Sequence, residues 1–318
     1  MINGILREEL NSFKTAYSEV LNDSDSHIQK ILDYIKDENG KLIRPTLFFL
    51  CQGLVKNPDI NTVSIAVLLE LLHTASLVHD DIIDNSEVRR GRNTAKEIWS
   101  NQSAVLLGDF LFSKVLKIGL SSRFPEVMQT TAKIVYDMAR EELRQSLRTD
   151  FYVPSEHDYF LNIQKKTGGL FEASCYLGGI VSYADPEQLD MLSEIGRNFG
   201  MAYQIIDDIM DYTGNEKIAG KNLKRDIFNG VLTLPFIYTY YGLDNKTKKH
   251  FKKSVQERSE QGIYDIYDYI VNNGGIDYAK QKAGKCFSDS ITLIEKFDNS
   301  IYRKEFVQFV RNGLTRFK

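Results

Sequence analysis

The spacing of apolar residues constrains the fold of this chain more than any other feature. Apolar residues recur at intervals of three and four along almost the whole length, which is the repeat of a helix with one buried face. One clear example is the series Leu192, Ile195, Phe199, Ala202, Ile206 and Ile209. No run of four to eight residues alternates convincingly in the way that a half-buried strand requires. The sequence therefore predicts an all-α fold, a bundle of many helices.

The positions of the prolines support this prediction, because most of the six stand where a helix should begin or a loop should turn. The candidate helices cover roughly 5–20, 24–37, 44–56, 61–84, 101–120, 124–149, 156–183, 186–212, 231–242, 245–259, 262–272, 276–296 and 300–316. No Pro/Gly/Ser-rich linker, low-complexity tract or solenoid repeat separates them. We therefore expect one domain over residues 1–318.

Composition excludes several classes of function. The 318 residues are 42% hydrophobic, enough for a sizeable core, and the net charge of −3 comes without a basic stripe, so no nucleic-acid partner is expected. The three cysteines are far apart, which fits a reducing compartment better than a disulfide framework. The first residues contain no apolar signal core, and the longest uncharged stretch, 227–243, is too short and too polar to span a membrane. We expect a cytoplasmic protein without stable membrane insertion.

Two acidic stretches interrupt otherwise apolar helical runs, "LVHDDIID" at 77–84 and "QIIDDIMD" at 204–211. Residues four apart on a helix share a face, so Asp80 and Asp84 should point the same way, with Asp81 beside them. In the second stretch, one polar stripe should hold Gln204, Asp207, Asp208 and Asp211. Each of the two helices therefore combines an apolar face with a narrow acidic face near its C-terminal end.

A solvated helix end explains either stretch alone about as well as a binding site does. It explains two stretches poorly, because carboxylates at a helix C-terminus oppose the macrodipole and would repel one another strongly if they converged. Hard oxygen ligands without a nearby cysteine or second histidine indicate Mg²⁺ or Mn²⁺ rather than zinc. Mg²⁺ usually fills its remaining positions with water and phosphate oxygens, so the two stretches suggest a phosphate-bearing substrate held between them.

Basic patches beside glycines agree with a phosphorylated substrate. They are "GKLIRP" at 40–45, "EVRRGRNT" at 87–94, "KKTGG" at 165–169 and "GKNLKRD" at 220–226. The first precedes a predicted helix, where backbone N–H groups favour phosphate. Charge runs are usually solvated surface, which is the simpler interpretation for Arg92 and Lys165. Four patches beside two acidic stretches are harder to explain in that way.

Together these residues resemble the trans-isoprenyl diphosphate synthases, or polyprenyl synthetases, over about residues 35–245. The shared motifs, in order, are GKxxRP at 40–45, DDxxD at 80–84, RRG at 89–91, KT at 166–167, QxxDDxxD at 204–211, GKxxxxD at 220–226 and TLP at 233–235. One DDxxD alone would be weak evidence, whereas seven motifs in register are strong evidence. The resemblance implies an isoprenoid synthase-like helix bundle with a central elongation cavity.

The resemblance also implies roles for individual residues. Mg²⁺, or Mn²⁺, would be bound by Asp80, Asp81, Asp84, Asp207, Asp208 and Asp211. The diphosphate of an allylic substrate would be bound by Arg89, Lys166, Thr167, Gln204 and Lys221. Isopentenyl diphosphate would be bound by Lys41, Arg44, His73 and Arg90. Catalysis would further use Lys166, Thr167 and Gln204. Lys166 would bind the departing diphosphate, whereas Gln204, the Thr167 hydroxyl and nearby carbonyl dipoles could stabilise an allylic cation without trapping it. A homodimer is also implied.

Product length depends on the residues one turn before Asp80, past which the growing chain would run. Here they are Ala75 and Ser76, both small, whereas short-chain members of the family look blocked by aromatic side chains. We therefore expect a long all-trans product, as made by octaprenyl or heptaprenyl diphosphate synthases. The alternatives are a short-chain synthase making C15 or C20 products, and a catalytic or regulatory subunit of a heteromeric synthase.

The chain departs from the family pattern at several positions. Lys224 and Val231 stand where glycine and lysine are more usual, and Asn93 replaces a common proline. Glu141 and Arg144 stand where a glycine and a smaller or apolar residue are common, which leaves the shape of the cavity open. None of these departures removes a predicted metal ligand.

Two other enzyme classes fit the sequence less well. A terpene cyclase of the same fold would have no use for Lys41, Arg44 and His73 as a second diphosphate site. A helical metal-dependent phosphohydrolase would need several histidine ligands, and the five histidines are mostly scattered. A prenyl diphosphate synthase remains the prediction.

Overall fold

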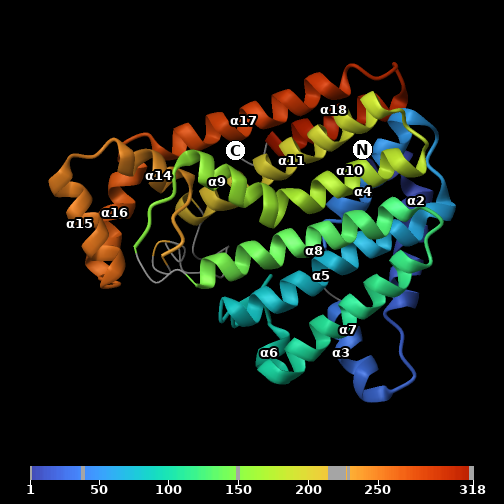
Figure 1. The fold of residues 1–318 in the computed structure, drawn as a ribbon, viewed down its shortest axis with the longest axis horizontal. Helices are drawn as coiled ribbons and strands as arrows, with labels where there is room; N and C mark the ends of the chain where they lie inside the picture. Colours follow the sequence, from blue (N-terminus) through green and yellow to red (C-terminus); the bar gives the residue numbers. More distant parts are fainter. Residues whose placement is uncertain (1, 37–39, 148–150, 214–226, 228–229, 315–318) are drawn as a thin grey trace. The chain divides into compact units, whose positions relative to one another are not determined.

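A computed structural model describes residues 2–36, 40–147, 151–213, 227 and 230–314 (Figure 1). The described chain is almost entirely helical, which confirms the all-α prediction. Its strands are β1 (Val88–Arg89) and β2 (Arg92–Asn93), which pair antiparallel as a minimal hairpin. The hairpin contains the RRG motif at 89–91. This hairpin was not predicted, because two-residue strands have no periodicity to detect.

The packing divides the chain into two compact units. Unit 1 comprises Met1–Ile134, Leu170–Gly196 and Leu293–Phe309, and unit 2 comprises Val135–Gly169, Arg197–Thr292 and Val310–Lys318. The boundaries fall inside α8 (Pro125–Ser146), α11 (Pro186–Thr213), α17 (Gly275–Ile294) and α18 (Ile301–Leu314). A single domain over 1–318 stays a prediction.

Unit 1 is built around α5 (Val63–Ile83). Its other elements include β1, β2 and parts of α8, α11, α17 and α18, together with α1 (Ile2–Ile5), α2 (Arg7–Val20), α3 (Ser26–Lys36), α4 (Ile43–Val55), η1 (Ile60–Thr62), α6 (Ala95–Ile98), α7 (Asn101–Leu120) and α10 (Gly169–Val181). Helix α5 packs along α7 and also contacts α2 and α4. Most of its residues from Ile65 to Leu72 are buried, because the apolar residues surround this helix instead of forming one stripe.

Two glycines allow close approach between helices of unit 1. A side-chain carbon at Gly108 of α7 would lie 2.0 Å from Nε2 of His79, so the imidazole of His79 occupies the space that this glycine leaves. A side-chain carbon at Gly178 of α10 would lie 2.5 Å from the carbonyl oxygen of Phe48 in α4. His79 immediately precedes the first aspartate stretch, so its packing on α7 helps to fix the end of α5.

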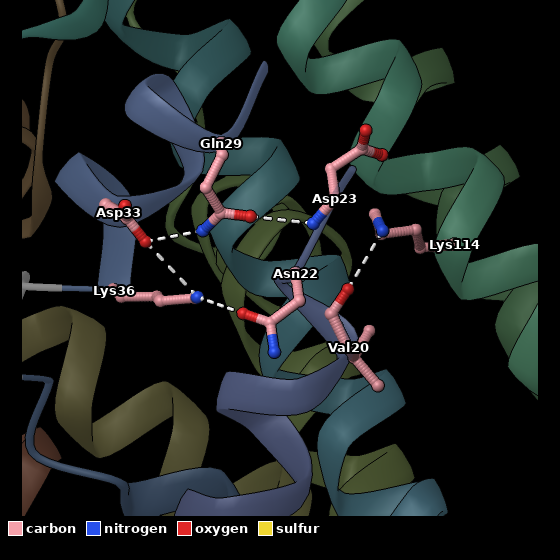
Figure 2. A network of polar contacts seen from close by, with 7 residues as sticks. All are labelled: Val20, Asn22, Asp23, Gln29, Asp33, Lys36 and Lys114. Carbon is pink, nitrogen blue, oxygen red and sulfur yellow. Dashed lines mark hydrogen bonds and ion pairs between the residues drawn. The ribbon is translucent and has the colours of Figure 1, made fainter. Parts of the chain in front are cut away.

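Polar contacts anchor the N-terminal helices of unit 1, as Figure 2 shows. The ammonium group of Lys114 on α7 donates to the carbonyl oxygen of Val20 at the end of α2 over 2.9 Å. The Lys36 ammonium donates to Oδ1 of Asn22 over 2.6 Å, and the Gln29 amide oxygen accepts from the backbone N–H of Asp23 over 2.7 Å. These bonds hold α3 to the loop before it and the end of α2 to α7.

One described segment, Ile60–Ile83, has the length and hydropathy of a membrane span, and 61% of its apolar window is buried inside the structure. A mostly buried core helix of a globular protein passes the same test. The burial of α5 against α7, α2 and α4 therefore accounts for its apolar composition.

Unit 2 contains α9 (Glu156–Ile163), the π-helical turn η2 (Gln164–Gly168), α14 (Leu234–Tyr241), α15 (Asn245–Gln256) and α16 (Glu260–Asn272), with the parts of α8, α11, α17 and α18 named above. Ser155 and Asp158 form a reciprocal capping box at the start of α9. The Glu156 carboxylate binds Tyr278 and Lys282 of α17, each over 2.5 Å, and so connects these two helices.

The predicted helices agree with those observed, with one informative difference. The predicted helix 156–183 is broken by η2 into α9 and α10. A π-helical turn inserts one extra residue into the helical repeat, and such turns are frequent at functional sites. Here the turn contains the KT motif, Lys166 and Thr167.

Candidate active site

The first aspartate stretch ends α5 in unit 1. Asp80 is half-buried and Asp84 exposed, and the backbone N–H of Asp84 donates to the carbonyl oxygen of Asp80 over 2.8 Å. They lie one helical turn apart, as their spacing predicts. Asp81 is different, because its side chain is buried and its Oδ1 accepts from both Nε and Nη2 of Arg89, each at 2.8 Å. A predicted metal ligand and a predicted diphosphate-binding cation thus bind each other.

The β1–β2 hairpin positions Arg89 and the next arginine. Arg90 (φ 51°) and Gly91 (φ 77°) both adopt the left-handed conformation, which two-residue turns between strands require. The hairpin is attached to the end of α5 by the Thr94 hydroxyl, which donates to the carbonyl oxygen of Ser86 over 2.8 Å. The RRG motif therefore reverses the chain immediately after the aspartates.

Arg44, His73 and Arg90, predicted to bind isopentenyl diphosphate, come together in unit 1. Arg44 is buried in the first turn of α4, where its guanidinium lies 4.4 Å from the ring centre of Phe171. The pKa of His73 on α5 lies well below its usual value because of burial first, and then because of the positive charges of Arg44, Arg90 and Arg89. A neutral His73 keeps one N–H donor beside guanidinium groups, a set of donors suited to a phosphate group.

Lys41, the fourth residue predicted for this site, is exposed just before α4. The next residue, Leu42, is left-handed (φ 49°) and occupies the N-cap position of α4 without a side-chain capping hydrogen bond. This geometry places Lys41 at the start of the helix that carries Arg44, where the helix dipole favours an anion.

The second aspartate stretch belongs to a chain of hydrogen bonds inside unit 2. The Thr167 hydroxyl of η2 donates to Oε1 of Gln204 on α11 over 2.7 Å. The Gln204 amide N–H donates to Oδ1 of Asp208 over 2.7 Å, and the Tyr159 hydroxyl of α9 donates to Oδ2 of Asp208 over 2.5 Å. The structure thus brings together the predicted residues Thr167, Gln204 and Asp208, and adds Tyr159.

Burial and hydrogen bonding act in opposite directions on the pKa of Asp208, a residue that is 5% exposed. Burial raises its pKa to about 7, the carboxylates of Asp207 and Asp211 add to the rise, and the hydrogen bonds from Tyr159 and Gln204 oppose it. Asp207 is exposed and Asp211 half-buried. Negative charge is therefore concentrated on this face of α11, and a bound cation would relieve it.

Lys166, predicted to bind the allylic diphosphate, forms an ion pair with Glu142 of α8 within unit 2. Glu141 and Arg144, two departures from the family pattern, also pair with each other, with Arg144 Nη2 2.6 Å from Glu141 Oε1. Sequence analysis did not identify Glu142 or Tyr159 as site residues, because an acid on a helix surface and an aromatic residue at helical spacing usually serve only solubility or packing.

The donor set fits a hard divalent cation. Within the residues that the structure describes, no three His, Cys, Asp or Glu side chains gather into a ready-made metal site. A Mg²⁺ ion bound through one or two carboxylates, with phosphate oxygens and water as its other ligands, needs no such group. Asp80 and Asp84 in unit 1, and Asp207 and Asp211 in unit 2, are half-buried or exposed and so fit this role by their accessibility, whereas Asp208 is buried.

Other predicted residues are placed less completely. Lys221 lies outside the described residues. Ala75 is fully buried in α5, and the half-buried Ser76 donates its hydroxyl to the carbonyl oxygen of His73 over 2.8 Å. Their role in product length stays a prediction.

Comparison with known proteins decides the family. The sequence model of the polyprenyl synthetase family matches residues 25–271. The chain belongs to this family. It is 27% identical over 316 residues to the octaprenyl diphosphate synthase of Escherichia coli, covering 99% of this chain and 98% of that one. It is 34% identical over 272 residues to heptaprenyl diphosphate synthase component 2 of Bacillus subtilis, covering 80% of this chain and 78% of that one.

The fold agrees with this assignment. The crystal structure of heptaprenyl diphosphate synthase from Staphylococcus aureus superimposes with a TM-score of 0.90 at 28% identity, covering 98% of this chain and 99% of that one. This polyprenyl synthetase is therefore a prenyltransferase of the polyprenyl diphosphate synthase type, as the motifs predict.

Proposed function

We propose that this polyprenyl synthetase condenses isopentenyl diphosphate with an allylic diphosphate, repeatedly, to give a long all-trans polyprenyl diphosphate. The observation that carries the proposal is the set of Arg44, His73 and Arg90, which are close enough for the two arginines to lower the pKa of His73. An enzyme that only ionised an allylic diphosphate would not need this second set of anion-binding side chains.

The residues divide the work between the two substrates. In the proposed reaction Arg89, Lys166 and Lys221 bind the allylic diphosphate, so that negative charge is stabilised as the C–O bond breaks. Lys41, Arg44, His73 and Arg90 bind isopentenyl diphosphate and orient its double bond toward the allylic carbon. The proton lost after condensation goes to the released diphosphate. Mg²⁺, when bound by the aspartates, would supply further charge stabilisation to the departing group.

The hydrogen-bond chain of unit 2 indicates how the allylic cation is tolerated. Thr167 gives its hydroxyl hydrogen to Gln204, so the oxygen lone pairs of Thr167 remain available to face positive charge. The bond from Gln204 to Asp208 fixes the amide, whose orientation would otherwise be free to reverse. Both groups then present oriented dipoles instead of a nucleophile that could trap the cation.

A direct assay tests the function. The purified protein is incubated with labelled isopentenyl diphosphate, an allylic primer and Mg²⁺, and the products are sized. Products well beyond fifteen carbons are expected, because the residues one turn before Asp80, Ala75 and Ser76, are both small. A product of C15 or C20 would favour the short-chain alternative, and consumption of primer without isopentenyl diphosphate would contradict condensation.

The assembly we propose is a homodimer. Helix α7 exposes large apolar side chains at helical spacing, of which Leu106 is 59% and Leu120 is 76% exposed, and such patches usually mark interfaces. Because the Bacillus subtilis relative is named as one component of its enzyme, a heteromer is the alternative. A sedimentation mass near that of two chains, with activity from this chain alone, would support the homodimer. A single-chain mass without activity would favour the heteromer.

A further inference from the structure

Glu70 is the one acidic side chain inside the most apolar part of α5. Its neighbours Val67, Leu68, Leu69 and Leu71 are fully buried, and Glu70 itself is 8% exposed. Its Oε2 is enclosed and accepts no hydrogen bond in the part of the chain that the structure describes. A carboxylate in such a position loses its hydration, so it needs compensation by positive charge.

The compensation comes from residues of the proposed isopentenyl diphosphate site. Burial raises the pKa of Glu70, and the charges of Arg44 and Arg90 oppose the rise. The same two arginines act on His73, one helical turn further along α5. Arg44 and Arg90 are therefore near enough for their charges to act on both Glu70 and His73.

The surroundings of Gly40 show that Glu70 and Arg90 lie close to each other. A side-chain carbon at position 40 would lie 3.3 Å from Oε1 of Glu70 and 3.8 Å from Nη1 of Arg90. The Glu70 carboxylate and the Arg90 guanidinium thus flank the same point of the backbone, immediately before Lys41. The segment that carries Lys41 passes over the carboxylate.

We infer that Glu70 is a positioning residue of the isopentenyl diphosphate site, a buried counter-ion that holds Arg44 and Arg90 together beside His73 until the substrate diphosphate binds. This inference rests on the proposed function. Arg44 is fixed by burial and by the Phe171 ring, whereas Arg90 is exposed on the hairpin turn. Without a carboxylate between them the two guanidinium groups repel, and the exposed one moves away.

The Glu70 carboxylate could also act in the opposite way, by weakening substrate binding. A carboxylate near an anion site also repels the anion, so removing its charge would strengthen substrate binding if this repulsion were its main contribution. Organisation of the arginines and repulsion of the substrate therefore predict opposite changes in the KM for isopentenyl diphosphate.

The experiment replaces Glu70 by the uncharged isostere, Glu70→Gln, and measures KM for each substrate separately. The KM for isopentenyl diphosphate is expected to rise about tenfold while that of the allylic primer changes less than about twofold. Glu70→Asp, which keeps the charge, is expected to fall between wild type and Glu70→Gln. The control is Glu141→Gln, an equally buried acid paired with Arg144, which should not separate the two KM values.

A double-variant cycle tests the route through Arg90. In an Arg90→Ala background, Glu70→Gln should add less than it does alone, because its partner is already absent. A lower or unchanged KM for isopentenyl diphosphate in Glu70→Gln overturns the inference, and so does an equal rise for both substrates. If Glu70→Gln does not fold, the KM values of Glu70→Asp for the two substrates are compared instead, and a rise for isopentenyl diphosphate alone is expected. Wild-type protein that does not use isopentenyl diphosphate would refute the proposed function instead.

Discussion

The two aspartate stretches have the same spacing but different chemistry at the same position. The middle residue is buried in both, with Asp81 7% and Asp208 5% exposed. Asp81 is bound by a guanidinium, whereas Asp208 is bound by a phenol and an amide. In the first stretch Asp81 therefore forms an ion pair with Arg89, a cation of the proposed site. In the second stretch Asp208 is a buried carboxyl group whose pKa is raised to about 7.

This difference separates two roles within one motif. The outer residues, Asp80 and Asp84 in one stretch and Asp207 and Asp211 in the other, lie on the more accessible side of each helix. The middle residues point inward and organise their neighbours, Arg89 in one case and Gln204 in the other. Sequence alone predicted all six aspartates as metal ligands, and it is burial and hydrogen-bond partners that set the two middle residues apart from the outer four.

The largest effect on activity is expected from the outer aspartates, for which the two stretches should behave alike. Asp80→Ala and Asp207→Ala should each lower kcat/KM about a thousandfold or more, since each removes a charge that serves the departing diphosphate. The melting temperature of the metal-free protein should stay the same or rise, because like-charge repulsion falls. Steady-state kinetics and circular dichroism check both points. Activity within about tenfold of wild type in either variant would show that its aspartate binds no essential metal.

The next effect distinguishes a cation proposed for isopentenyl diphosphate, Arg44, from one proposed for the allylic diphosphate, Lys166. Arg44→Ala should raise the KM for isopentenyl diphosphate by roughly tenfold to a hundredfold, and Lys166→Ala should do the same for the allylic primer. Each variant should affect the other substrate much less. Initial rates with one substrate varied at a time measure this, and equal losses for both substrates would mean that the two diphosphate sites are not separate.

The sequence could predict features that depend on local helical spacing, but not those that depend on tertiary contacts. Helical spacing predicted α5, α11 and the polar stripe on each, because periodicity is a local property. It did not predict the π-helical turn at Thr167, nor the left-handed Arg90 that reverses the hairpin. Tyr159 and Asp208 are 49 residues apart in the sequence, so their bond depends on tertiary packing that no local pattern encodes.

A smaller effect concerns stability and has opposite signs in the two stretches. Asp81→Asn should destabilise the protein by about 1–3 kcal/mol, because it leaves Arg89 without its carboxylate. Asp208→Asn should stabilise the metal-free protein at pH 8, because it removes a buried charge whose raised pKa reports a cost to the folded state.

The pH dependence of the second variant follows from the direction of that pKa shift. The folded-state pKa of Asp208, about 7, lies above the ordinary value of 3.8, so the wild-type carboxyl destabilises the fold most above pH 7. This cost shrinks as the pH falls and the folded protein takes up a proton. The advantage of Asp208→Asn should shrink with it. Chemical denaturation in the presence of a chelator, at pH 8 and pH 5.5, measures the change. Equal and same-signed shifts for both variants would remove the distinction between the two middle residues.

The smallest effect on activity is expected from Tyr159→Phe, which removes one hydroxyl and leaves the hydrogen bonds from Thr167 to Gln204 and from Gln204 to Asp208 in place. Asp208 keeps its bond from Gln204, so the amide should retain most of its orientation and kcat should fall only about threefold. Stability should fall by about 1–3 kcal/mol at pH 8, because one buried carboxylate oxygen loses its donor. Phe160→Tyr, the neighbouring aromatic in α9, serves as a control for general disturbance of this helix. If Tyr159→Phe lowered kcat as far as Asp207→Ala does, the phenol would belong to the reacting groups and the division between outer and middle residues would have to be redrawn.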